Sequence, residues 1–247
     1  MTTLPIDRRP SGATMSIVGH LTELRRRLII SIAAVAIASV VVFVFSNQII
    51  GLLVDFYRDA TGGKRDALVF TGPLDAFATR LKVATYGGVA LAFPVWIWQL
   101  WRFVTPALSP REKRYAVPFL LSSIAFFALG AAIALLTLPN ALDFLLNIGG
   151  NELQPLLTAD KYLSLVTVMM LAFGAAFEFP VLLMFLLLAR VLSTRQLRRW
   201  RPWTIVGIVV FAAVITPSQD PYSLIAMAVP MYILYEACII AGRILHR

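Results

Sequence analysis

Residues 115–138 read YAVPFLLSSIAFFALGAAIALLTL, a stretch in which no side chain carries a charge. A helix rises 1.5 Å per residue, so about 20 such residues cross a hydrocarbon core about 30 Å thick. Five further stretches are similarly apolar: 28–46, 83–101, 162–189, 203–215 and 222–242. Hydrocarbon offers the backbone no hydrogen-bond partner, so these stretches are expected to be helices. The sequence predicts an all-α polytopic membrane protein with six transmembrane helices.

The composition agrees with this class. Hydrophobic residues make up 59% of the chain and charged residues 14%, whereas soluble domains are about half apolar and about one quarter charged. Cys238 is the single cysteine. An intrachain disulfide and a cysteine-based zinc site are therefore both excluded.

Two of the six stretches depart from the usual length. Residues 162–189 exceed what a span needs and should tilt or protrude, whereas 203–215 amount to about 20 Å of helix. The bilayer is expected to become thinner around the short one. Prolines within or near the predicted spans tend to kink helices, and they are Pro94, Pro118, Pro180 and Pro230. A kinked, concave bundle is therefore expected.

The basic residues predict the orientation. If the N-terminus lies inside, 16 of the 22 Lys and Arg residues fall on inner segments and six on outer ones. By the positive-inside rule, both termini are expected in the cytoplasm, with the protein in the cytoplasmic (inner) membrane. The formal net charge of +9 is therefore interpreted as a topology signal, and no nucleic-acid partner is predicted.

The chain shows no repeat and no second domain. Residues 1–15 are expected to be a disordered cytoplasmic N-terminus, and 16–247 a single six-helix membrane domain. The apolar residues from Ile17 to Leu28 recur at helical spacing, which predicts a surface helix that runs into the first span. Residues from Asn47 onward and residues 140–148 are each predicted to form a helix on the outer surface.

Common catalytic motifs are absent from the sequence. It contains no phosphate-binding G-x-x-x-x-G-K-[ST] or G-x-G-x-x-G loop, no G-x-S-x-G and no H-E-x-x-H. His20 and His246 lie near the cytoplasmic ends of predicted helices. No enzyme activity, catalytic residue, metal site or cofactor is therefore predicted.

Polar residues inside predicted spans are candidates for function. Glu178 lies near the middle of the fourth span, where an ionised carboxylate costs about 3 kcal/mol on insertion scales. It is expected to face the bundle interior, a cavity or a partner, or else to be protonated or hydrogen-bonded as a structural residue. Gln99 and Glu236 are weaker cases, since Glu236 could reach the cytoplasmic surface or pair with Arg243.

Glu23 and Glu112 are nearly the only acids on the basic cytoplasmic face. Each has a structural alternative, which spacing alone favours. Glu23 could pair with Arg27 four residues later on a helix, and Ser109 with Glu112 fits a capping box at the start of the third span. Asp220 similarly fits an N-cap for the last span.

Several motifs together resemble the TatC family, the polytopic subunit of the Sec-independent twin-arginine protein translocase. The segments are HLTELRRRL (20–28), PVWIWQLWRFVTPALSPREKR (94–114), AFGAAFEFP (172–180), ITPSQDP (215–221) and AVPMYILYE (228–236). They extend through most of the chain, and in combination they are highly specific.

This resemblance implies a receptor that binds the twin-arginine signal peptides of folded proteins. Glu23 and Glu112 would meet the two arginines of the signal, and a surrounding set would shape the site, namely Arg25, Phe103, Pro106 and Leu108. Glu178 and Gln99 would be polar groups within the membrane, and Asp220 a motif residue at the outer end. The implied partners are single-span TatA- and TatB-type proteins, the lipid bilayer and further copies of the chain, with transport driven by the proton-motive force.

Two other functions remain open from the residues alone. A proton-coupled small-molecule transporter could use Glu178 as its coupling carboxylate, although such proteins usually show repeated halves. A purely structural scaffold would need no individual carboxylate.

Overall fold

The computed structural model describes residues 17–61, 68–104, 116–149 and 157–245. In these ranges the chain is helical, apart from turns, short connections and one β-bridge between Val69 and Thr158. The helices are α1 (Ile17–Val44), α2 (Ser46–Ala60), α3 (Asp75–Leu91), α4 (Phe93–Val104), α6 (Ala116–Asn147), α7 (Ala159–Ala176), α8 (Phe179–Leu188), α9 (Thr194–Ile215) and α10 (Pro221–Leu245). The all-α prediction is confirmed for this part of the chain.

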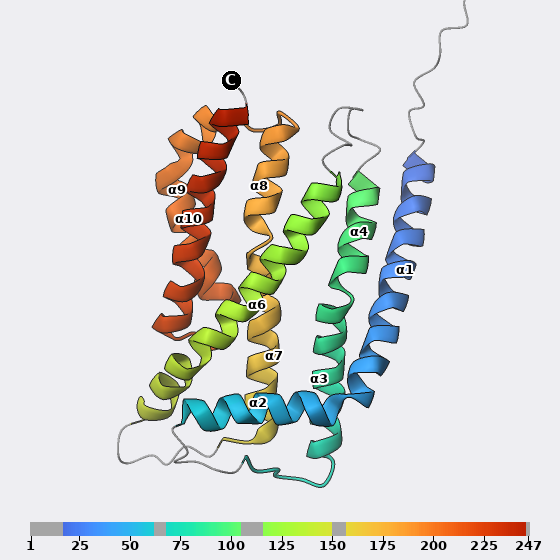
Figure 1. Cartoon of the computed structure of the whole chain (residues 1–247), viewed down its shortest axis with the longest axis vertical. Coiled ribbons are helices and arrows are strands. Elements are labelled where there is room, and N and C mark those ends of the chain that lie inside the picture. Colours follow the sequence, from blue (N-terminus) through green and yellow to red (C-terminus); the bar gives the residue numbers. More distant parts are fainter. Residues whose placement is uncertain (1–16, 62–67, 105–115, 150–156, 246–247) are drawn as a thin grey trace, which may run out of the picture.

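Most helices run lengthwise beside one another, and α2 lies across one end (Figure 1). Four segments are long and apolar enough to cross a membrane: Gly19–Val44, Ala116–Asn147, Ala159–Leu188 and Pro221–Ile244. The bent pair α3–α4 adds a fifth if its halves form one span. The polar first half of α9 keeps that helix outside this group. A multi-span membrane protein is confirmed, while the sixth span, the inside termini and the single domain over 16–247 stay predictions.

Two breaks interrupt helices of the bundle next to a proline. α3 and α4 meet at 48°, and Pro94 is the second residue of α4. Pro180 is likewise the second residue of α8, directly after the break that separates α7 from α8. Proline lacks the N–H that would continue the preceding helix, so both breaks have a local cause. Pro230, by contrast, lies inside a continuous α10, and Pro118 in the first turn of α6.

The long helix α6 corrects one expectation. The sequence predicts a separate surface helix over residues 140–148, but α6 continues through Pro139 to Asn147. Ala141 and Leu142 are buried on this extension, so packing against neighbouring helices keeps the chain helical past the proline.

The outer-surface helix predicted from Asn47 is α2, which starts one residue earlier. Tyr162 at the start of α7 donates a hydrogen bond of 2.7 Å to the Leu53 carbonyl, and its ring lies 5.0 Å from that of Tyr57. All three residues are buried, so one face of α2 packs against the bundle.

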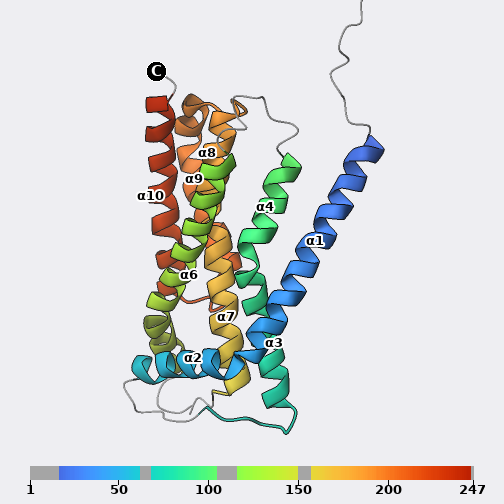
Figure 2. The ribbon, with the colours of Figure 1, turned by 45° about the vertical axis from the view of Figure 1, so that its right-hand side comes forward.

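α1 lies at the edge of the molecule and packs against α3 and α4 (Figures 1 and 2). The predicted surface helix and first span form this one uninterrupted helix. Its approach to α3 is close because residue 88 is glycine: a Cβ there would lie 2.7 Å from the Cα of Ser39. This contact fixes the position of α1, which carries Glu23.

Candidate functional site

Glu23 lies on α1 one turn before Arg27, and the two side chains form an ion pair. Oε1 of Glu23 accepts hydrogen bonds from Nε of Arg27 at 3.1 Å and from Nη2. Only 18% of the Glu23 side chain and 16% of the Arg27 side chain are exposed. The spacing-based alternative for Glu23, pairing with Arg27, is therefore confirmed.

The second oxygen of Glu23 is different. Its Oε2 is buried and finds no hydrogen-bond partner among the described residues. A buried carboxylate oxygen without a donor is costly. The geometry therefore leaves one acceptor position of Glu23 open to a further donor.

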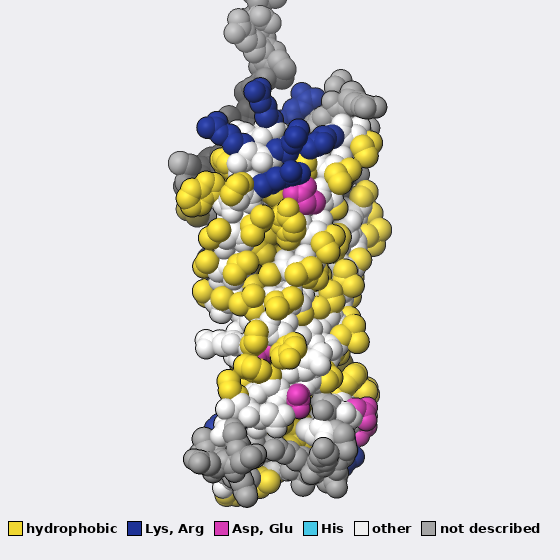
Figure 3. All heavy atoms as spheres, turned by 90° about the vertical axis from the view of Figure 1, so that its left-hand side faces the viewer, with side chains coloured by type: hydrophobic (Ala, Val, Ile, Leu, Met, Phe, Trp, Pro, Cys, Tyr) yellow, Lys and Arg dark blue, Asp and Glu magenta, His cyan; other side chains and the backbone are white. Residues whose placement is uncertain are grey.

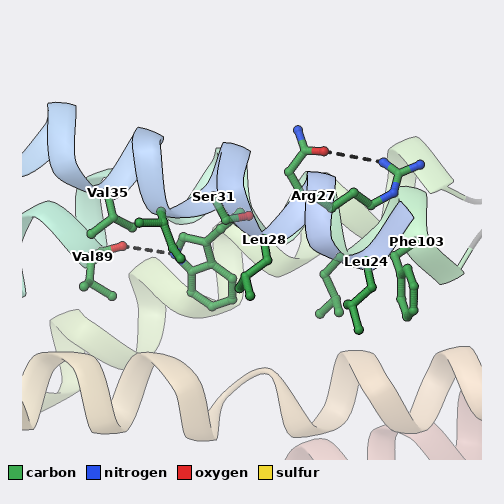
Figure 4. A pocket seen from close by; sticks show the side chains of 11 residues that line it. Leu24, Arg27, Leu28, Ser31, Val35, Val89 and Phe103 are labelled. Carbon is green, nitrogen blue, oxygen red and sulfur yellow. Dashed lines mark hydrogen bonds between the residues drawn. The ribbon is translucent and has the colours of Figure 1, made fainter. Parts of the chain in front are cut away.

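Arg27 also connects α1 to α4. Its Nη1 donates to Oε1 of Gln99 at 3.4 Å (Figure 4). The sequence predicts Gln99 only as a polar residue within the membrane; in the structure it is linked through Arg27 to Glu23. Sequence reasoning missed this contact, since it depends on how closely α1 approaches α4.

An apolar groove of about 440 Å³ opens beside this polar chain. Its walls come from α1 and from α3–α4, and the lining residues include Leu24, Leu28, Val35, Val89 and Phe103 (Figure 4). The indole of Trp96 also lines it and donates 3.1 Å to the Val89 carbonyl across the break between α3 and α4. The groove thus joins apolar walls to a charged group at one end.

Phe103 reaches this end of the groove from α4. Its ring stacks on His20 of α1, with centroids 4.4 Å apart. Gln99 and Phe103 are four residues apart on α4, so they share the face that meets α1. That spacing could have identified both residues from the sequence as one surface.

The other predicted signal-binding residues divide into two groups. Arg25 is exposed and forms no ion pair within the described ranges. Pro106, Leu108 and Glu112 lie outside the described residues, as do Ser109 and the proposed capping box. The expectation that Glu23 and Glu112 bind the two arginines of the signal therefore stays a prediction.

Glu178 lies at the break between α7 and α8. It lines a hollow of about 310 Å³ together with Trp101 of α4, Ser123 of α6 and Phe211 of α9. Of the surroundings expected for this carboxylate, the structure shows a cavity, while its role stays a prediction. The hollow is separate from Glu23, and Oε1 of Glu178 is buried without a hydrogen-bond partner in the described structure.

The two remaining acids have structural partners. Asp220 is 1% exposed and caps α10, since its Oδ1 accepts from the Ser223 amide at 2.8 Å. Glu236 accepts from Arg201 of α9 at 2.5 Å, whereas Arg243 was the partner considered from the sequence. Arg201 lies on the neighbouring helix, so helical spacing along α10 could not identify it.

Comparisons with known proteins agree with these features. The family model described as Sec-independent protein translocase protein (TatC) matches residues 19–230. A TatC protein of Frankia casuarinae is 43% identical over 245 residues, covering 95% of this chain and 67% of the relative. One from Aquifex aeolicus is 38% identical, covering 94% of this chain and 97% of the relative.

The fold gives the same result. A crystal structure of the twin-arginine translocase receptor TatC superposes with a TM-score of 0.77 at 38% identity, covering 92% of this chain and all of that one. A second TatC structure, in the detergent DDM, gives a TM-score of 0.75. Family model, relatives and fold together show that this chain belongs to the TatC family of Sec-independent protein translocase proteins.

Proposed function

We propose that this protein is the receptor subunit for twin-arginine signal peptides in the cytoplasmic membrane. It would act with single-span TatA- and TatB-type partners, in complexes that hold several copies of the chain, and use the proton-motive force to export folded proteins. The observation that carries the proposal is the half-paired carboxylate of Glu23, whose ion-pair partner Arg27 lines an apolar groove.

The chemistry suits a guanidinium ligand. Oε1 of Glu23 is paired with Arg27, and the buried Oε2 has no hydrogen-bond partner among the described residues. An arginine of the signal could therefore donate to Oε2 or replace Arg27. Arginine offers a planar fork of N–H donors that matches a carboxylate, whereas lysine offers a single point charge. The apolar walls of the groove limit water on one side, which strengthens charge pairing.

Arg27 would compete with the signal arginine for the Glu23 carboxylate. If it leaves Glu23, it keeps a hydrogen-bond acceptor in Gln99. The exchange of one guanidinium for another keeps the Glu23 carboxylate paired and leaves the displaced Arg27 one hydrogen bond, which offsets part of the free-energy cost of the exchange.

The test is the binding of a twin-arginine signal peptide to the purified full-length protein, measured by fluorescence anisotropy. We expect Glu23→Gln to weaken binding about tenfold or more, because the carboxylate that pairs with the signal is lost. Glu112→Gln should also weaken it, since glutamine still completes a capping box but carries no charge. Asp55→Asn, an exposed acid on α2, is the matched control and should leave affinity unchanged.

Two further measurements distinguish recognition of the signal arginines from a role of the Glu23–Arg27 ion pair in helix stability. Arg27→Gln breaks the same ion pair as Glu23→Gln but keeps the carboxylate, so the peptide should still bind. A peptide with two lysines in place of the arginines should bind the native protein more weakly. Equal losses in Glu23→Gln and Arg27→Gln, or equal binding of both peptides, would assign the ion pair to structure alone.

A further inference from the structure

A group of exposed arginines lies where α9 begins and α10 ends. Arg195, Arg198 and Arg199 belong to the first two turns of α9, and Arg243 to the last turn of α10. All four are exposed, and none forms an ion pair within the described ranges. We call these four residues the arginine patch. Figure 3 shows Lys and Arg side chains gathered at this end of the α9–α10 face.

The two helix ends are in contact. A Cβ at Gly242 would lie 2.8 Å from Cγ2 of Thr194, so the residue before Arg243 touches the residue before Arg195. Four positive charges therefore share one small area, although they come from segments far apart in the sequence.

The nearby acid does not neutralise the patch. Glu236 is engaged by Arg201 at 2.5 Å and by the Tyr232 hydroxyl, which donates to it at 3.2 Å. The Glu236 carboxylate is thus paired with Arg201, which lies outside the patch. The four charges of the patch keep no counter-charge from the described protein.

The position of these arginines on α9 adds to the uncompensated positive charge of the patch. The N-terminus of a helix carries a partial positive charge, which favours acids there and disfavours bases. α9 has no acid in its first turn and begins with a Ser193–Gln196 capping box. An external anion at the patch would relieve the repulsion between arginines and helix dipole.

The surface next to the patch indicates the source of that anion. Ile205 and Val206 follow Arg198 and Arg199 by seven residues, a separation that returns to the same helix face. Both are exposed, and the adjacent Trp203 is 78% exposed. Aromatic side chains of this kind collect at the boundary between headgroups and acyl chains. Along this face, therefore, arginines give way to tryptophan and then to aliphatic side chains.

We propose that the arginine patch binds the headgroups of anionic phospholipids in the adjacent membrane leaflet. The arginines would hold the phosphates, while the acyl chains lie along the exposed aliphatic face of α9. A lipid with net negative charge is required, because a zwitterionic headgroup would bring a positive charge back to the patch. The continuous apolar face favours a lipid over a soluble phosphate as the occupant.

Quenching of tryptophan fluorescence by brominated lipids tests this proposal. The full-length protein is reconstituted in phosphatidylcholine vesicles that contain a minor fraction of brominated phosphatidylglycerol or, in a parallel sample, brominated phosphatidylcholine. We expect the brominated anionic lipid to quench at least about twofold more strongly, because each arginine near the surface attracts it. The double variant Trp200→Phe, Trp203→Phe should remove most of this difference, since both tryptophans are exposed beside the patch.

The triple variant Arg195→Gln, Arg198→Gln, Arg199→Gln should quench equally with both lipids. The control variant Arg58→Gln, Arg80→Gln, Lys161→Gln removes as much charge from exposed positions near the opposite ends of the helices and should keep the preference. Circular dichroism of both variants checks that they fold. A preference that survives in the triple variant, or its absence in the native protein, would overturn the proposal. Full competition by soluble glycerol phosphate would also overturn it, in favour of a soluble anion.

Discussion

Single glycines determine how closely neighbouring helices approach at two crossings of the bundle. Gly88 lets α3 meet the backbone of α1 at Ser39, and Gly130 lets α6 meet the Phe173 carbonyl of α7. Small residues at such crossings are typical of membrane helices, whose association depends on close packing. Gly88 has the more direct effect on the candidate site, because it positions the helix that carries Glu23 and Arg27.

We predict that Gly88→Ala lowers stability by about 1–3 kcal/mol, the usual cost of overpacking. Its Cβ would lie 2.7 Å from backbone atoms of Ser39, so the two helices must move apart and the groove must widen. Cys238 is the only cysteine and is buried, so a thiol-reactive dye reports unfolding during a thermal ramp. Peptide binding should weaken in parallel.

Gly207→Ala is the control for this prediction, since nothing lies within 4 Å of a Cβ at that position. Alanine there should leave the melting temperature unchanged or raise it, because alanine is the better helix former. Equal melting temperatures for the two variants would mean that α1 and α3 can separate without cost.

At the scale of the helices, the sequence predicted what depends on local composition. α1, α2 and α10 follow from their apolar stretches and, at the start of α1, from helical periodicity. The breaks before α4 and α8 follow from Pro94 and Pro180. The extension of α6 past Pro139 could not be predicted from the local sequence, because it depends on the burial of Ala141 and Leu142 against other helices.

In the candidate site, too, contacts within one helix could be predicted from the sequence and contacts between helices could not. The contact between Glu23 and Arg27 follows from their spacing on one helix. The contacts of Arg27 with Gln99 and of Arg201 with Glu236 join different helices. They depend on crossing geometry, which composition and spacing do not specify.

The helix α9 offers a prediction at this scale. Its apolar portion, 203–215, measures about 20 Å, against a hydrocarbon core of about 30 Å. Four leucines inserted after Val210 add about 6 Å and rotate the following residues by about 40°, so the buried face stays nearly aligned. If the short helix thins the bilayer around the protein, this insertion should reduce export of a folded reporter protein.

The control for the insertion keeps the length constant. Ile205, Val206, Val209 and Val210 are exposed, and their replacement by leucine adds apolar surface without lengthening α9. This variant should export normally. Full export by the longer helix would show that a short α9 is unnecessary for transport.

At the scale of the whole molecule, the open question is whether α9 crosses the membrane. By length and composition, four segments qualify as spans and the bent α3–α4 pair adds a fifth. α9 nevertheless runs beside α10 through most of its length, as the contacts of Gly242 with Thr194 and of Met227 with Thr216 show. Both ends of α9 are thus matched by α10, an apolar helix long enough to span.

We predict that the two ends of α9 lie on opposite sides of the membrane. Cys238→Ala removes the only native cysteine, so single cysteines can be introduced at Val191, before α9, and at Gln219, after it. Both positions are exposed. In intact cells a membrane-impermeant maleimide should label Gln219→Cys only, and after permeabilisation it should label both. The 16-to-6 distribution of basic residues predicts that Val191 lies inside. Labelling of both positions in intact cells would contradict a sixth span. Labelling of Val191→Cys alone would show the opposite orientation.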